Sequence, residues 1–193
     1  MIAGVLKETY PGESRVALVP AHIGSLKKKG FEIYVESGAG LDAGFTDAMY
    51  EAEGASVKDR KEVLSKSDVL LQVRALGSNS SSDSEDAGNL KDGAIVIAVM
   101  DSLTNKGPVE TLASRGAKAF ALELVPRISR AQSMDVLSSQ ANIAGYKAAL
   151  IAADSLPKMF PMMMTAAGTI TPASVLVVGA GVAGLQAIAT CNR

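Results

Sequence analysis

Three closely spaced glycines near the end of the chain form the motif most typical of a ligand site in this sequence. An apolar run at residues 175–178 leads into Gly179, Gly181 and Gly184, and a helix-forming segment follows. In such a turn the first glycine permits a tight bend, the second lets the backbone approach a pyrophosphate, and the third lets helix and strand pack closely. The pattern predicts a dinucleotide site with the pyrophosphate on the helix N-terminus, although similar turns also serve plain packing.

A second group of polar side chains lies in the segment ELVPRISRAQSMDVLSSQANIAGYKA. Five of them fall within twelve residues: Arg127, Arg130, Gln132, Asp135 and Ser138. The segment follows an apolar run at residues 117–122, and ligands of open α/β sheets bind where the strands end. These side chains are therefore candidates for a binding site. The spacing alone leaves a second interpretation open, namely a surface loop with one Arg–Asp pair and a Ser or Asp cap on the following helix.

Hydrophobic patterning indicates the elements that position these residues. Short apolar and β-branched runs predict buried strands at residues 2–6, 31–35, 69–73, 94–99 and 117–122. Helical patterns lie between or after them, at residues 20–30, 46–53, 59–65, 104–114 and 136–153. Strands that alternate with helices predict an α/β fold with a parallel sheet covered on both faces.

The remaining segments suggest the domain organisation. Residues 76–89 are serine-rich and acidic, which predicts a solvated surface loop. The methionines of PMMM at residues 161–164 are expected to fill an irregular core or a domain seam. We place the domain boundary near residues 164–172, with a Rossmann-like N-terminal domain at 1–165 and the beginning of a second, dinucleotide-binding Rossmann domain at 166–193.

The second domain is incomplete in this sequence. A dinucleotide-binding unit needs at least a second parallel strand and an acidic residue about 20 positions beyond the glycines, which holds the adenosine ribose. Neither lies within the 193 residues. We therefore expect the chain as written to bind its dinucleotide weakly or not at all, and to be inactive alone.

Composition excludes several classes of protein. A formal net charge of −1 with 4% aromatic residues provides neither the basic face nor the stacking surface of a nucleic-acid-binding protein. The single cysteine, Cys191, excludes an intramolecular disulfide and a cysteine-rich zinc site, and we expect no metal. The start of the chain has no secretory signal, which favours a cytoplasmic protein. The uncharged stretch at residues 159–192 could span a bilayer by its length, but its prolines and glycines argue against a membrane span.

Longer motifs carry a resemblance to a known family. The segments VPRISRAQSMDVLSSQANIAGYKA and PMMMTAAGTITPASVLVVGAGVAGLQAIAT resemble the NAD(H)-binding component of the proton-translocating NAD(P) transhydrogenases. The segments GVLKETYPGESRVALVPAHI, YVESGAG and FTDAMYEAEGA are shared more broadly with alanine dehydrogenases. Together these segments extend the resemblance over essentially the whole chain.

The resemblance implies specific roles and partners. Arg127, Gln132 and Asp135 would be catalytic and, with Ser138, would contact the nicotinamide end of NAD(H). The three glycines of the turn would cradle the pyrophosphate. The family passes hydride from NADH to NADP(H) held by a separate component, and a membrane-embedded component couples this transfer to proton translocation. The resemblance also implies a homodimer that lies peripherally on the cytoplasmic side of the inner membrane, without a span of its own.

Two alternatives remain open at this point. An alanine dehydrogenase is suggested by Arg15 and Arg74, which fall where that family places cations for its substrate. However, those enzymes use a histidine near the end of the fourth predicted strand, where this sequence has VMDSLTN at residues 99–105. The only histidine is His22, in the first predicted helix, where a structural role is expected. The second alternative is a truncated, non-catalytic fragment.

Overall fold

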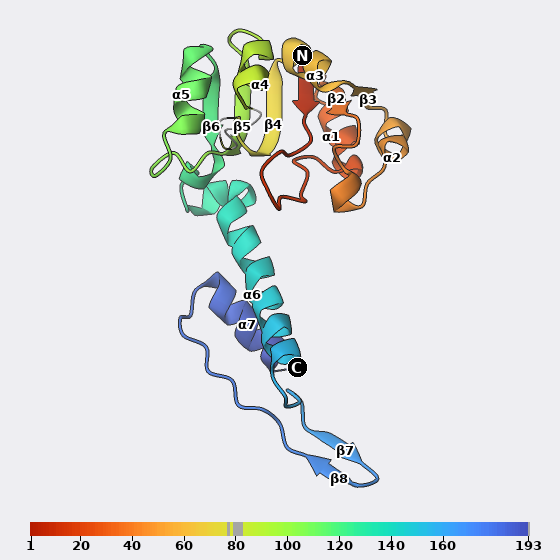
Figure 1. The fold of residues 1–193 in the computed structure, drawn as a ribbon, viewed down its shortest axis with the longest axis vertical. Helices are drawn as coiled ribbons and strands as arrows, with labels where there is room; N and C mark the ends of the chain where they lie inside the picture. The colour runs from red at the N-terminus through yellow and green to blue at the C-terminus, as the bar shows by residue number, and fades with distance from the viewer. Residues whose placement is uncertain (77, 79–82, 193) are drawn as a thin grey trace. The chain divides into compact units, whose positions relative to one another are not determined.

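The structure, a computed structural model, describes residues 1–76, 78 and 83–192. The chain divides into two compact units, Met1–Val125 and Pro126–Arg193 (Figure 1). The first unit contains a large sheet with its helices, and the second contains a long helix and the glycine-rich turn.

In the described part of the first unit, six parallel strands form one sheet in the order β3–β2–β1–β4–β5–β6. They are β1 (Ile2–Val5), β2 (Glu32–Glu36), β3 (Ser56–Lys58), β4 (Val69–Arg74), β5 (Ile95–Val99) and β6 (Lys118–Ala121). This is the strand order of a Rossmann sheet, in which the chain crosses from β3 to β4 and the direction of winding reverses beside β1. The predicted α/β fold and its five strands are confirmed, and β3 is a further short strand.

Helices connect these strands and cover the sheet (Figure 1). They are α1 (Ile23–Lys27), α2 (Asp47–Ala52), α3 (Arg60–Lys66), α4 (Asp83–Asn89) and α5 (Gly107–Ser114), with short 3-10 turns η1 (Pro20–His22), η2 (Leu41–Ala43) and η3 (Leu122–Leu124). The helix predicted from residue 104 begins at Gly107, because the N–H groups of Thr104 and Asn105 form a turn onto the Asp101 carbonyl.

Two hydrophobic clusters form the core of the first unit, one on each face of the sheet. On one face, Ile23 of α1 and Tyr50 of α2 pack over β1 and β2. On the other face, Leu64 of α3 and Leu112 of α5 pack over β4 and β5. Successive residues of a strand point to opposite faces, so the central strands contribute to both clusters. This packing fixes the carboxyl ends of the strands, where the polar loops begin.

The acidic segment contains a helix, so the prediction of a loop over residues 76–89 is wrong for residues 83–89. Asp86 is buried and accepts two hydrogen bonds from Arg60, at 2.8 and 2.6 Å. Leu90, directly after the helix, is also buried. Composition suggested solvation, whereas one of the acidic side chains is an ion-pair partner. The serines at positions 80–82 lie outside the described residues.

The second unit begins with η4 (Ser129–Met134) and the 20-residue helix α6 (Val136–Ser155). A hairpin of β7 (Met163–Thr165) and β8 (Gly168–Ile170) follows, and then α7 (Val182–Cys191). α7 packs against α6 (Figure 1). The long helix predicted at residues 136–153 is confirmed. Nowhere in the described ranges does a helix combine the length and apolar character needed to cross a bilayer.

Two expectations for the second unit are wrong. Residues 175–178 form no strand, because a strand needs a hydrogen-bonded neighbour and the described part of this unit pairs only β7 with β8. Leu176 and Val178 are accordingly 88% and 93% exposed. The methionines at positions 162–164 are exposed as well, and do not fill a core.

The predicted domain boundary at residues 164–172 stays a prediction. The two compact units reflect contacts within this chain, whereas a Rossmann domain is defined by its complete sheet. The assignment of residues 1–165 and 166–193 to separate domains is therefore compatible with a compact unit that begins at Pro126.

Candidate functional site

The glycine-rich turn has the backbone geometry that its sequence predicts. Gly179 has a φ of 104°, in the region that favours glycine. Gly184 lies in the first turn of α7, and a Cβ there would lie 2.1 Å from the carbonyl oxygen of Gly179. Gly181 has a φ of −77° and open space where a side chain would be. The first and third glycines thus shape the turn, and the second leaves the backbone bare.

The N-terminus of α7 is open to an anion. α7 runs for ten residues, and its N-cap Gly181 provides no side-chain hydrogen bond. Its first turn contains no acidic residue. The first N–H groups of a helix and the helix dipole attract negative charge, so this end of α7 can hold a phosphate group.

The second predicted group lies on η4 and at the start of α6. Asp135 caps α6, since its carboxylate accepts hydrogen bonds from the Ser138 N–H at 2.9 Å and from the Ser138 hydroxyl at 2.6 Å. These hydrogen bonds hold the pKa of Asp135 below its usual range, and the charge of Arg127 lowers it further. Asp135 is therefore an anion at neutral pH. The Arg127 and Gln132 side chains are exposed.

The structure does not bring the loop and the glycine-rich turn into contact. α6 approaches α7 at Gly145, ten residues beyond Asp135. Ten residues of α-helix span roughly 15 Å. A ligand that touched both groups would have to extend along α6. A dinucleotide meets this requirement, because its nicotinamide and its pyrophosphate lie at different points along its length.

Arg15 and Arg74, the cations that suggested an amino-acid substrate, both have carboxylate partners. Arg15 pairs with Glu13 at 2.6 Å, and Arg74 pairs with Asp101 at 2.5 Å. Asp101 lies in the segment that lacks the histidine, and its φ of 52° is unusual for a residue other than glycine. A cation that is already paired with a carboxylate attracts a substrate carboxylate less strongly.

Two further carboxylates clamp loops at the carboxyl ends of the strands, and no sequence motif pointed to them. Glu8, after β1, accepts hydrogen bonds from the N–H groups of Val73 and Arg74, at 2.7 and 3.0 Å. Burial raises the pKa of Glu8, while these two hydrogen bonds oppose the rise. Glu123 accepts hydrogen bonds from both the N–H and the hydroxyl of Ser102, at 3.0 Å each. These clamps hold the loops that follow β1 and β5.

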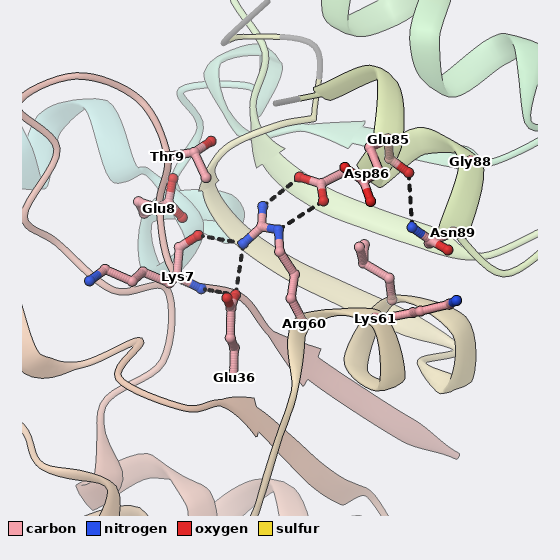
Figure 2. A pocket seen from close by; sticks show the side chains of 11 residues that line it. Lys7, Glu8, Thr9, Glu36, Arg60, Lys61, Glu85, Asp86, Gly88 and Asn89 are labelled. Carbon is pink, nitrogen blue, oxygen red and sulfur yellow. Dashed lines mark hydrogen bonds and ion pairs between the residues drawn. The ribbon is translucent and has the colours of Figure 1, made fainter. Parts of the chain in front are cut away.

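A pocket of about 910 Å³ lies in the first unit beside Arg60 (Figure 2). The Arg60 guanidinium lies between the carboxylates of Glu36, at 2.7 Å, and Asp86, at 2.6 Å. It also donates a hydrogen bond to the Lys7 carbonyl oxygen at 3.0 Å. Because its donors point to groups of the protein, we interpret Arg60 as a structural junction between β2, α3 and α4.

This junction gives a stability prediction. Arg60→Leu leaves Glu36 and the buried Asp86 without their shared cation, so we expect the free energy of unfolding to fall by about 3 kcal/mol. Lys61→Leu removes the same charge from the next, exposed residue and is expected to change stability by less than about 0.5 kcal/mol. Urea unfolding of both variants measures the difference. Equal stability of the two variants would show that Arg60 does not hold α4.

Comparisons with known proteins agree with this geometry. Residues 4–144 match the family described as alanine dehydrogenase/PNT, N-terminal domain, and residues 148–193 match alanine dehydrogenase/PNT, C-terminal domain. The first of the chains that make up NAD(P) transhydrogenase subunit alpha in Rhodospirillum rubrum is 48% identical over 195 residues, which cover 100% of this chain and 50% of that protein. The crystal structure of transhydrogenase from Sinorhizobium meliloti matches with a TM-score of 0.92 and 47% identity, over 100% of this chain and 54% of that chain.

A more distant relative represents the alternative activity. Alanine dehydrogenase of Mycobacterium tuberculosis is 29% identical over 196 residues, which cover 100% of this chain and 51% of that protein. The chain thus spans about half the length of the curated relatives that it matches.

Proposed function

The chain belongs to the alanine dehydrogenase/PNT family, and from this membership we propose that it is the NAD(H)-binding component of a proton-translocating NAD(P)+ transhydrogenase. The observation that carries the proposal is the glycine-rich turn, in which Gly184 admits no side chain against Gly179 and Gly181 leaves the entrance to α7 bare. The transhydrogenase names of the relatives at 48% and 47% identity support the same activity.

The residues of the second unit fit a dinucleotide. The bare backbone at Gly181 and the free N–H groups of α7 would hold the pyrophosphate. Asp135 accepts the Ser138 hydroxyl hydrogen, which leaves the Ser138 oxygen free to accept a hydrogen bond from the nicotinamide carboxamide. The exposed Gln132 amide can bond the same carboxamide.

The proposed reaction needs orientation rather than acid or base. When bound, NADH supplies a hydride, two electrons and a proton, which NADP+ on the partner component accepts. No further proton is exchanged, so the residues of this chain must fix the position of the ring. The opposite charges of Arg127 and Asp135 suit this task, because the ring is neutral before the transfer and positive after it.

The proposal includes partners. NADP(H) would be held by a separate component, and a membrane-embedded component would couple the transfer to proton translocation and keep this chain on the cytoplasmic side of the membrane. We also propose a homodimer. In support, α6 carries exposed apolar side chains at helical spacing, Ile143, Tyr146 and Leu150, on the face opposite the buried Gly145 and Ala149.

Titration calorimetry on the complete protein, extended to the length of its relatives, tests the NAD(H) assignment. We expect a stoichiometric complex with NADH and a weaker one with NADPH. A complex with NADPH alone would show that this chain is not the NAD(H) component.

The alanine dehydrogenase alternative leads to a separate prediction. We expect no NAD+-dependent oxidation of L-alanine by the complete protein, because residues 99–105 lack the proton-transferring histidine and Asp101 neutralises Arg74. NADH formation is followed by its absorbance, and NADH binding by the same preparation shows that the protein is folded. NADH formation that depends on alanine would favour the alternative.

A further inference from the structure

Gly145, in the middle of α6, touches the first turn of α7 with its backbone. The residue is buried, and a Cβ at this position would lie 2.1 Å from the Ala183 carbonyl oxygen and 3.0 Å from the Ala183 Cα. A glycine inside a helix is less stable than an alanine by roughly 1 kcal/mol. The close approach of α7 gives a physical reason for a glycine here, since α6 and α7 could not reach this separation with any other residue.

The neighbouring residue makes a second contact of the same kind. Gly184 follows Ala183, and its missing Cβ would lie 2.1 Å from the Gly179 carbonyl oxygen. Ala183 therefore touches α6 while Gly184 touches the glycine-rich turn. The first turn of α7 is thus fixed by backbone contacts on both α6 and the turn, with no side chain between them that could adjust.

We propose that Gly145 is a positioning residue for hydride transfer, and this inference rests on the proposed function. α6 is one continuous helix that carries Asp135 at its N-cap and Gly145 at its contact with α7. The separation of α6 and α7 at Gly145 therefore sets the distance between the pyrophosphate turn and the nicotinamide loop. A change in this separation moves a bound dinucleotide relative to Arg127 and Asp135.

Gly145→Ala in the complete protein tests the proposal. The alanine Cβ must move from 2.1 Å to beyond the 3.0 Å that real contacts respect, so α7 shifts away from α6. A shift of about 1 Å at a reacting centre lowers a transfer rate by on the order of a hundredfold. α7 and its turn move together, because the contact between Gly184 and Gly179 is unchanged. We therefore expect the NADH dissociation constant to stay within about threefold while hydride transfer to NADP+ slows by about a hundredfold.

Two further variants separate positioning from ordinary packing. Gly24→Ala in α1 is the matched control, because a Cβ there has nothing within 4 Å, and it should keep the parent rate and affinity. Ala149→Val lies on the same buried face of α6, one turn further along, and should slow transfer in the same direction by a smaller factor. This variant also provides a result if Gly145→Ala does not fold.

The measurements distinguish the possible failures. Stopped-flow transfer rates and NADH dissociation constants are measured on the parent and on all three variants. Transfer at the parent rate by a folded Gly145→Ala protein, or a loss of affinity as large as the loss of rate, overturns the positioning role. A parent protein that binds no NADH overturns the proposed function itself, and the positioning role with it.

Discussion

Arg127→Ala and Asp135→Asn are expected to slow hydride transfer by about a hundredfold in the complete protein, while the NADH dissociation constant changes little. Most of the binding energy should come from the pyrophosphate and adenosine contacts of the Rossmann fold. The loop residues would touch only the nicotinamide, whose placement sets the transfer distance. The loss should therefore appear in kcat, and not mainly in KM.

The structure makes Asp135→Asn a clean substitution. Asparagine caps a helix about as well as aspartate, and its carbonyl oxygen can still accept the hydrogen bond from the Ser138 N–H. The variant therefore removes the charge and leaves the cap. Arg130→Ala is the matched control for Arg127→Ala, because it removes an arginine from the same loop that has no proposed contact. Unchanged rates at saturation with a collapse of NADH affinity would make the loop a binding clamp.

Gly184→Ala is expected to weaken NADH binding by on the order of a hundredfold, the loss that a displacement of about 1 Å causes at a site of this kind. The added Cβ would lie 2.1 Å from the Gly179 carbonyl oxygen, so it forces the turn away from the helix N-terminus. Alanine stabilises a helix interior relative to glycine by roughly 1 kcal/mol, so weaker binding cannot be attributed to a less stable α7.

Titration calorimetry measures this loss, with Gly24→Ala as the control at an open helical position. Gly184→Ala and Gly145→Ala are expected to differ in kind. The first separates the turn from α7 and lowers affinity, whereas the second moves both together and lowers the rate. NADH binding by Gly184→Ala at the parent affinity would mean that the turn does not hold the pyrophosphate.

Much of the first unit could be predicted from the sequence, because its strands are short apolar runs between clear turn and helix signals. The runs at residues 31–35 and 69–73, for example, correspond to β2 and β4 within one residue at each end. The roles of Gly179 and Gly184 could also be predicted, since they follow from spacing and backbone conformation alone.

Other features depend on partners that are distant in the sequence, and local patterns do not reveal them. Residues 175–178 have the composition of a strand, but in the described structure no neighbouring strand pairs with them. Asp86 has the composition of a solvated loop residue until Arg60, 26 residues earlier, provides its partner. Gly145 becomes informative only when Ala183 is known to lie against it.

Stopped-flow measurement of hydride transfer tests the central claim most directly. The complete protein is loaded with NADH and mixed with an NADP(H)-binding transhydrogenase component that holds NADP+. We predict that NADH is oxidised and NADPH is formed at the same rate, with one NADPH for each NADH lost. Tight binding of NADH without formation of any NADPH would contradict the assignment of this chain as the NAD(H) component of a transhydrogenase.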